Sequence, residues 1–218
     1  MSLTVVHLVR HGEVHNPEGI LYGRLPGYHL SDLGRRMAGR VAESFRGVRL
    51  DALVSSPLER ARETMAPIAA EHPALTVVQD ERLIEAGNVF EGQVFGPRNQ
   101  ALLRPQAWRH FLNPLKPSWG EPYDDIAARL GAAIAAARAA VGEGGQALLV
   151  SHQLPIWTAR LQAEGRHLFH DPRKRRCSLA SVTSLSFAGD VLVRVDYAEP
   201  AKDLLPAKLA NKAFSVGK

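Results

Sequence analysis

The chain has 218 residues, of which 45% are hydrophobic and 22% are charged, and its formal net charge is +5. This composition is typical of a globular protein with a sizeable core and indicates one domain of the α/β class. The modest positive charge suits small acidic ligands and does not require a nucleic-acid partner. The single cysteine, Cys177, excludes an internal disulfide and fits a reducing compartment, where we expect it to be buried and inert.

The chain shows neither a secretion signal nor a membrane span. No basic segment followed by an apolar one opens it, and no apolar run reaches the length of a bilayer crossing. We therefore expect a cytoplasmic protein without a membrane partner.

The first predicted element is a short apolar run that ends abruptly in Arg10-His11-Gly12. Val5–Val9 is typical of a buried strand, and Gly12 of the sharp turn after it. A guanidinium and an imidazole thus lie side by side at the carboxyl end of a strand, where ligands bind in open α/β sheets. A neutral imidazole can attack phosphorus, and an Arg can hold phosphate oxygens with two hydrogen bonds. On its own the tripeptide is as compatible with a structural pair as with a site.

Helices and strands alternate after this turn. Residues 15–29 form a loop that carries Asn16, Tyr22 and Arg24, whose side chains are candidates for one site. A helix is predicted from Ser31 or Asp32 to about Phe45, a strand over 51–56, a helix from Pro57 to about Ala70, and a strand over 76–78. Ser56 is the expected N-cap of the second helix, so Arg60 falls in or near its first turn.

The middle of the chain contains an irregular stretch. Glu81, Glu85 and Glu91 lie in a Gly-containing loop, and spacing does not choose a proton donor among them. Residues 93–122 are rich in Pro and are expected to form a cap with some helix over 100–111. A helix over 124–141, a strand over 147–152 that ends in His152, and a helix over 154–163 follow.

The last part contains a basic run, Arg173–Arg176, for which a solvated surface is the default and a phosphate or nucleic-acid patch the sharper alternative. Strands are predicted over 177–187 and 191–197, the second alternating as Val191, Val193, Val195 and Tyr197. This pair offers an edge for a possible homodimer. Residues 199–218 are predicted to be a loosely held tail.

Strands alternating with helices favour a three-layer αβα sandwich with a mostly parallel central sheet and a small cap insertion at about 93–122, within one domain over 1–198. The carboxyl ends of parallel neighbours share one edge of a sheet. Arg10, His11, Arg60 and His152 are therefore expected to converge on a single anion.

Four short blocks now resemble the histidine phosphatase superfamily, which includes the cofactor-dependent phosphoglycerate mutases. They are Val9-Arg10-His11-Gly12-Glu13, Ser55-Ser56-Pro57-Leu58-Glu59-Arg60-Ala61, Leu83-Ile84-Glu85 with Phe90-Glu91-Gly92, and Val150-Ser151-His152. Their order within residues 4–197 makes the resemblance specific.

The resemblance implies a role for each candidate residue. His11 would be the nucleophile that becomes phosphorylated, and Arg10, Arg60 and His152 would complete the phosphate site. Glu85 would be the general acid and then the base. Asn16 matches a phosphate-contacting Asn of the family, one residue early in this chain. Tyr22 and Arg24 are expected to contact the substrate, and no metal or other cofactor is implied.

The favoured function is therefore a metal-independent phosphatase for a small phosphorylated metabolite, acting through a phosphohistidine on His11. The alternative is a cofactor-dependent phosphoglycerate mutase, disfavoured by the short chain. Two other classes are a metal-dependent hydrolase that uses His7, His11, His15 and His152, and a binding module with an inactive site.

Overall fold

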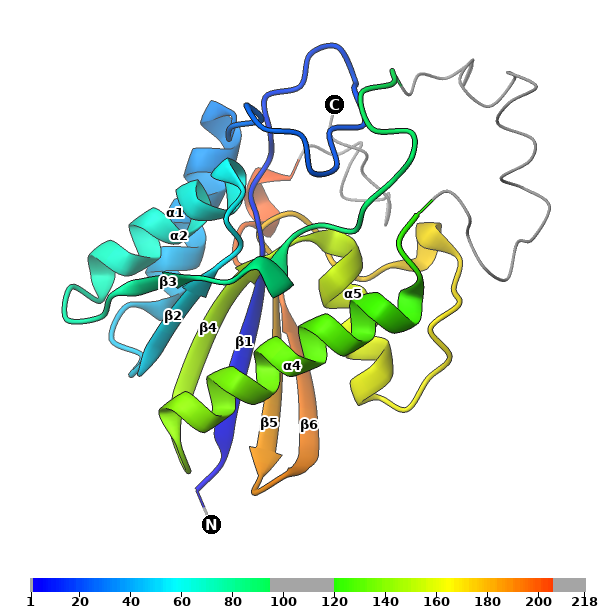
Figure 1. The fold of residues 1–218 in the computed structure, drawn as a ribbon. Coiled ribbons are helices and arrows are strands. Elements are labelled where there is room, and N and C mark those ends of the chain that lie inside the picture. Colours follow the sequence, from blue (N-terminus) through cyan, green and yellow to red (C-terminus); the bar gives the residue numbers. More distant parts are fainter. Residues whose placement is uncertain (1, 95–119, 206–218) are drawn as a thin grey trace.

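A six-stranded sheet forms the centre of the protein, for which the computed structural model describes residues 2–94 and 120–205. The strand order across the sheet is β3-β2-β4-β1-β5-β6 (Figure 1). The strands are β1 (Thr4–Arg10), β2 (Ala52–Ser55), β3 (Val77–Gln79), β4 (Gln146–Ser151), β5 (Val182–Ala188) and β6 (Val191–Ala198). β1 to β4 run parallel to one another, while β5 is antiparallel to both β1 and β6. The predicted α/β class with a mostly parallel sheet is confirmed.

Helices cover both faces of this sheet (Figure 1). One hydrophobic cluster joins α1 (Asp32–Phe45) and α2 (Glu59–Glu71) to the first face, and a second joins α4 (Tyr123–Val141) and α5 (Gln153–Ala163) to the other. Alternation along β1 explains the division, since Val9 belongs to the first cluster and Val6 and Leu8 to the second. Short 3₁₀ helices lie at Glu81–Leu83, Pro172–Lys174 and Lys202–Leu204.

The second helix starts later than the sequence predicts. α2 begins at Glu59 with Leu58 as its N-cap, and Leu58 makes no side-chain capping bond. Ser56 is therefore not the N-cap; its hydroxyl accepts from the Leu58 amide at 3.4 Å and also hydrogen-bonds with His152 Nε2 at 2.8 Å. Arg60 still lies in the first turn, as predicted.

A β-bulge changes the predicted pattern of β6. Phe187 pairs with Leu192 and Ser186 with Arg194, so Val193 is the extra residue between them. The bulge shifts the alternation, and Leu192 packs on the core with Val195 while Val191 and Val193 are exposed. The start of β5 also differs, at Val182 instead of Cys177. Cys177 itself is buried with a free thiol, as predicted, and burial raises the pKa of that thiol.

Residues 199–205, expected to belong to a loose tail, pack against the domain. Ala201 is buried, Leu204 and Leu205 contact the first hydrophobic cluster, and Asp203 forms an ion pair with Arg40 of α1. Apolar residues in this segment explain why it docks. The predicted cap helix over 100–111, most of the cap and the rest of the tail lie outside the described residues.

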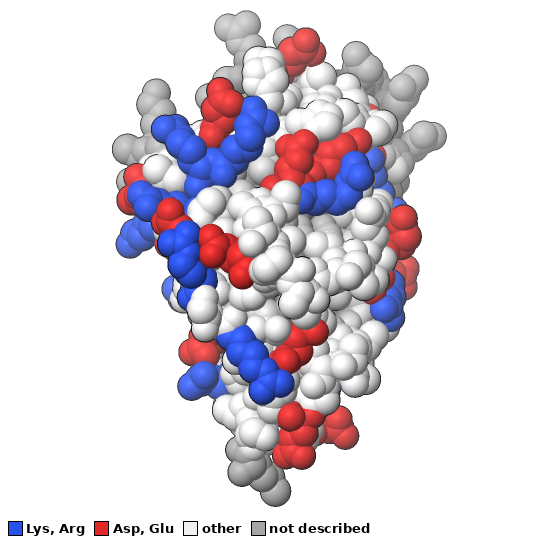
Figure 2. Space-filling model, turned by 90° about the vertical axis from the view of Figure 1, so that its left-hand side faces the viewer, with Lys and Arg blue, Asp and Glu red and all other residues white. Residues whose placement is uncertain are grey.

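Charged side chains of both signs lie close together on the side of the molecule that carries α1 and α2 (Figure 2). Arg40 pairs with Glu43, and Arg46 with Glu71. Such exposed pairs contribute little to stability, about 0–1 kcal/mol each. In the described part of the chain, no helix combines the length and the apolarity that a bilayer crossing demands.

Two glycines allow the turn after β1 to pack closely against the start of α1. A Cβ on Gly12 would lie 2.5 Å from the Gly34 carbonyl oxygen, and one on Gly34 would lie 2.0 Å from the Glu13 carbonyl oxygen. Neither position has room for a side chain, because backbone blocks it on each side. This contact fixes the path of the chain that carries His11.

Gly34→Ala is therefore expected to lower the free energy of unfolding by about 1–3 kcal/mol through overpacking. Gly39→Ala in the same helix is the matched control, since a Cβ there meets nothing within 4 Å. The control should raise the free energy of unfolding by roughly 0.5–1 kcal/mol, because Ala favours helix over Gly. Urea unfolding of both variants checks this, and equal effects would contradict the close contact.

Candidate active site

Three parallel strands end side by side and carry the predicted site residues. Arg10 of β1 lies opposite Ser151 of β4, and Ser55 of β2 lies opposite Val150 of β4. His11 and His152 immediately follow β1 and β4, and Arg60 lies in the first turn of α2, the helix after β2. The predicted common edge is therefore present, and its strand ends lie at the centre of the sheet (Figure 1).

The backbone fixes His11 at this edge and selects its tautomer. The His11 amide donates to the Ser151 carbonyl at 3.1 Å. On the ring, Nδ1 lies 2.7 Å from the Gly12 carbonyl oxygen, which can only accept, so Nδ1 carries the proton. Nε2 then keeps its lone pair, as a nucleophile requires.

His152 lies directly beside His11. The two ring centroids are 5.1 Å apart, and the His152 side chain is fully buried. Its Nε2 lies 2.8 Å from the Ser56 hydroxyl, while its Nδ1 has no hydrogen-bond partner among the described residues. A buried polar atom without a partner is costly, and a bound ligand would supply one.

Two buried guanidinium groups lie with the imidazoles. Arg60 is fully buried; its Nη2 donates to the Gly23 carbonyl at 2.6 Å, while its Nε and Nη1 have no partner in the described structure. Arg10 is 4% exposed; its Nη1 donates to the Cys177 carbonyl at 2.7 Å, and its Nε is unpaired among the described residues. We call Arg10, His11, Arg60 and His152 the Arg–His cluster.

The positive charge of this cluster has no acidic partner. Neither guanidinium forms an ion pair within the described ranges, and residues 95–119 and 206–218 contain no Asp or Glu. Buried cations are normally paired, because removing a charge from water costs several kcal/mol. The cluster thus favours an anionic ligand.

Burial and these charges together hold both imidazoles neutral. Burial, followed by the charge of Arg60, lowers the pKa of His11 well below its ordinary value, and Arg10 adds to this effect. The pKa of His152 is lowered in the same way, by burial, by Arg60 and by His11. A neutral His11 is the form that can attack phosphorus at neutral pH.

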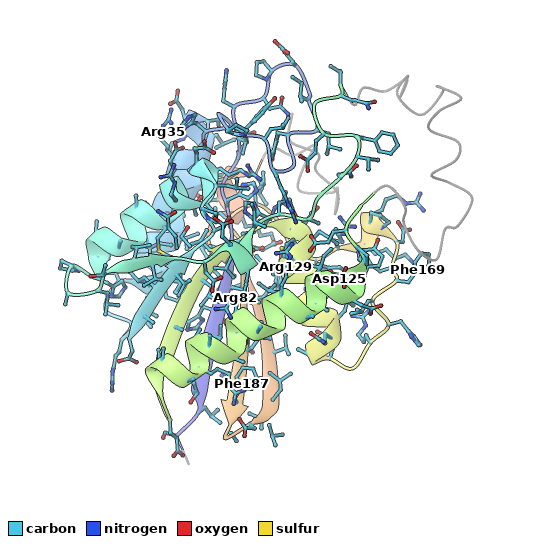
Figure 3. All side chains as sticks on the ribbon, in the orientation of Figure 1. Arg35, Arg82, Asp125, Arg129, Phe169 and Phe187 are labelled. Atoms are coloured by element: carbon cyan, nitrogen blue, oxygen red, sulfur yellow. The ribbon has the colours of Figure 1, made fainter. Side chains whose placement is uncertain are left out.

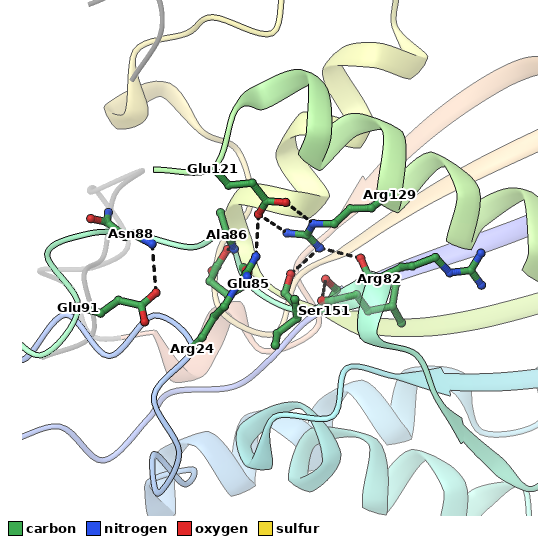
Figure 4. Close-up of polar contacts among 11 residues, drawn as sticks. Arg24, Arg82, Glu85, Ala86, Asn88, Glu91, Glu121, Arg129 and Ser151 are labelled. Atoms are coloured by element: carbon green, nitrogen blue, oxygen red, sulfur yellow. Dashed lines mark hydrogen bonds and ion pairs between the residues drawn. The ribbon is translucent and has the colours of Figure 1, made fainter. Parts of the chain in front are cut away.

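Glu85 lies in a loop that three charged side chains support (Figure 4). Arg24 Nε donates to the Glu85 carbonyl at 2.7 Å, and Arg129 Nη1 donates to the Ile84 carbonyl at 2.7 Å. Glu121 joins the two arginines through contacts of 2.8 Å to each. We call Arg24, Glu121 and Arg129 the clamp. Arg129 reaches the loop from α4 and also binds the Arg82 carbonyl (Figure 3).

The Glu85 side chain is anchored within the same loop. Its Oε1 accepts from the Ala86 amide at 2.8 Å. The negative charge of Glu85 also acts on Arg60, raising that guanidinium's pKa against the larger lowering by burial. Glu85 thus belongs to the electrostatic environment of the Arg–His cluster, on the side of the clamp.

The remaining predicted residues lie in the loop over 15–29. Asn16 is buried, and its amide makes two hydrogen bonds with the backbone of Ile20. The Tyr22 ring lies 4.8 Å from the Arg60 guanidinium and stacks on Tyr28. Arg24 is a member of the clamp and pairs there with Glu121. Phosphate contact by Asn16 and substrate contact by Tyr22 and Arg24 stay predictions.

Sequence reasoning missed two kinds of supporting residue. Ser56 follows a strand end, and that position was the available signal, although its side chain was interpreted as a helix cap. The Thr64 hydroxyl accepts a hydrogen bond from the Gly12 amide and donates one to the Arg60 carbonyl, and these two bonds link the turn at His11 to α2. Glu121 and Arg129 carry no comparable sequence signal, because their contacts are long-range.

The alternative of a metal site on His7, His11, His15 and His152 finds no support in the geometry. Both ring nitrogens of His7 are occupied, by Ser184 and Gln146. Across residues 2–94 and 120–205 no group of three or more His, Cys, Asp or Glu is arranged to hold a metal ion.

The buried imidazoles predict a pH-dependent stability. A histidine whose folded pKa is lowered binds protons more readily in the unfolded chain, so stability is retained above the ordinary value of 6.5 and lost as pH falls below it. The free energy of unfolding should fall by up to about 1.4 kcal/mol per pH unit for each such histidine.

His152→Asn should lose less stability than the wild type between pH 7 and pH 5, as measured by urea unfolding. His167→Asn, at an exposed position, is the control and should follow the wild type; parallel profiles for all three proteins would contradict the prediction.

Comparison with known proteins agrees with this arrangement. The sequence matches the histidine phosphatase superfamily (branch 1) over residues 6–199. It is 55% identical over 198 residues to the uncharacterized protein Rv0525 of Mycobacterium tuberculosis, covering 91% of this chain and 97% of that protein. It is 31% identical to the probable phosphoglycerate mutase GpmB of Proteus mirabilis, covering 81% of this chain and 83% of the relative.

A solved structure shares the fold. The mycobacterial glucosyl-3-phosphoglycerate phosphatase Rv2419c in complex with VO3 superimposes with a TM-score of 0.70 at 25% identity, covering 89% of this chain and 98% of that one. The match over residues 6–199 includes every member of the Arg–His cluster and all of the sheet except the first two residues of β1. The protein therefore belongs to the histidine phosphatase superfamily and is an enzyme of that kind.

Proposed function

We propose that the protein hydrolyses a small phosphorylated metabolite through a phosphohistidine on His11, without a metal ion. The observation that carries this proposal is the Arg–His cluster, in which two buried guanidinium groups without acidic partners flank a neutral imidazole whose Nε2 is unprotonated. A phosphoryl group is the anion that fits both the charge and the nucleophile.

In the first step the lone pair of His11 Nε2 forms a bond to phosphorus, and the bond between phosphorus and the ester oxygen breaks. Glu85 gives its proton to that oxygen, which leaves as an alcohol. Arg10 and Arg60 stabilise the charge on the equatorial oxygens, and they need no reorganisation because their positions are fixed by backbone carbonyls.

In the second step a water oxygen bonds to phosphorus and the bond to Nε2 breaks. The Glu85 carboxylate takes the water proton, inorganic phosphate leaves and the neutral imidazole is restored. His152 lies beside His11 and gains an anionic neighbour when phosphate is bound, which favours its protonated, donating form.

A phosphoglycerate mutase is the second candidate, and the relative from Proteus mirabilis with that probable activity supports it. The relative Rv2419c, by its name a phosphatase, supports hydrolysis. The two activities differ in whether water or a second hydroxyl accepts the phosphoryl group. Incubation with 3-phosphoglycerate and a trace of 2,3-bisphosphoglycerate separates them, since a mutase forms 2-phosphoglycerate and a phosphatase releases phosphate.

His11→Asn is expected to abolish phosphate release, by about 10³-fold or more, because it removes the nucleophile. Brief incubation of the wild type with a ³²P-labelled ester should trap an acid-labile, base-stable label on His11, and the variant should show none. His167→Asn is the control and should keep full activity. Label on another residue, or activity that a chelator removes, would contradict the mechanism.

Glu121→Gln is expected to lower kcat/KM, which reports the first step and not the later hydrolysis of the phosphohistidine, by about 10- to 100-fold for an alkyl phosphate, because the clamp no longer fixes the Glu85 loop. The effect on p-nitrophenyl phosphate should be much smaller, since its leaving group departs without a proton. Glu164→Gln, which loses pairs with Arg160 and Arg166 away from the cluster, is the matched control. Equal losses in kcat/KM for both substrates would show that Glu121 does not act on the first step through Glu85.

A further inference from the structure

The basic run over 173–176 contains one residue that differs from its neighbours. Arg173, Lys174 and Arg176 are exposed, as the default interpretation of the run predicts, but Arg175 is only 8% exposed. Arg173 pairs with Asp171, and Arg176 lies over the Tyr197 ring. Arg175 follows the 3₁₀ helix Pro172–Lys174 and points its guanidinium into the protein.

The contacts of Arg175 are with neutral groups. Its Nε donates to His170 Nε2 at 2.8 Å. The other ring nitrogen of His170 donates to the Leu168 carbonyl at 2.6 Å, so Nε2 is the unprotonated nitrogen and the ring is neutral. The Tyr123 side chain also hydrogen-bonds with Arg175, and its ring lies 5.3 Å from that of His170.

No carboxylate of the described residues forms an ion pair with this buried guanidinium. Arg175 forms no ion pair within residues 2–94 and 120–205, and the rest of the chain contains no acidic side chain that could supply one. A bound phosphoryl group would pair with the guanidinium groups of Arg10 and Arg60. It would leave Arg175 as a third buried cation that still lacks an anion.

Arg175 lies on the Glu85 side of the Arg–His cluster. The charge of Glu85 raises the pKa of Arg175 against the larger lowering by burial, as it does for Arg60. Two residues after Arg175, the Cys177 carbonyl accepts from Arg10. Tyr123 opens α4, two residues after Glu121 of the clamp, and its contact with His170 joins α4 to the segment of Phe169; Asp125 and Phe169 are labelled in Figure 3.

Under the proposed function, Glu85 protonates the leaving oxygen, so its side of the cluster is where the alcohol part of the substrate lies. We propose that Arg175 binds a second anionic group on that alcohol part. The substrate would then be a phosphomonoester whose alcohol part carries a carboxylate or a second phosphate. The inference rests on the proposed function and extends it to the substrate class.

Two substrate pairs that differ in one anionic group test the proposal. 3-Phosphoglycerate and glycerol 3-phosphate differ by a carboxylate in place of a hydroxymethyl group, and fructose 1,6-bisphosphate and fructose 6-phosphate differ by a phosphate. The wild type is expected to prefer the more anionic member of at least one pair in kcat/KM, by about 10- to 100-fold. The pair that shows the preference identifies the second anion.

Arg175→Met should remove that preference and keep hydrolysis of p-nitrophenyl phosphate, which carries no second charge. Lys174→Met, the neighbouring exposed cation, is the matched control and should retain the wild-type preference. An equal loss on every substrate would assign Arg175 a structural role and overturn the proposal, as would a wild type without preference or a variant that keeps it.

The two proposals fail in different ways. If the wild type releases no phosphate from any ester and forms no phosphohistidine, the proposed function fails. If it hydrolyses p-nitrophenyl phosphate through His11 but treats both members of each pair alike, only the role of Arg175 is wrong.

Discussion

Buried positive charge without acidic partners is the constraint on which the site depends. Arg10 and Arg60 are removed from water at the edge of the sheet, and among the described residues each guanidinium donates to one backbone carbonyl. Burial, reinforced by their charge, keeps His11 and His152 neutral, and an anion is the component that the site lacks. Nucleophile, ligand charge and fixed geometry thus follow from one arrangement.

The fold makes this arrangement possible because it brings three strand ends together. β1, β4 and β2 are neighbours in the sheet. His11 follows β1, His152 follows β4 and Arg60 lies in the first turn of the helix after β2, so all three lie at the same edge. The close contact between Gly12 and Gly34 and the bonds of Thr64 connect this edge to α1 and α2. The first helical layer therefore supports the nucleophile directly.

The second layer supports the other half of the chemistry. Arg129 of α4 and the Arg24–Glu121 pair fix the backbone around Glu85, while Tyr123 at the start of α4 reaches Arg175. The described ends of the predicted cap, at Val94 and Gly120, pair with Ile20 and Asn88 of the same loops. Elements around the proposed general acid thus connect to the part of the sequence expected to cover the substrate.

The sequence was sufficient to predict the α/β class and the mostly parallel sheet, because these follow from the local periodicity of apolar residues. It also predicted that one edge of the sheet carries Arg10, His11, Arg60 and His152. That prediction follows from where the strands end, because the carboxyl ends of parallel neighbours share an edge. The tertiary structure alone decided the rest. The hydroxyl of Ser56 hydrogen-bonds with His152 although Ser56 is not the N-cap of α2, a bulge shifts β6, residues 199–205 dock, and one arginine of an apparently solvated run is buried. The clamp likewise joins side chains from separate loops and a helix. Each of these depends on contacts between residues far apart in the chain, and local sequence does not encode which distant groups a side chain will meet.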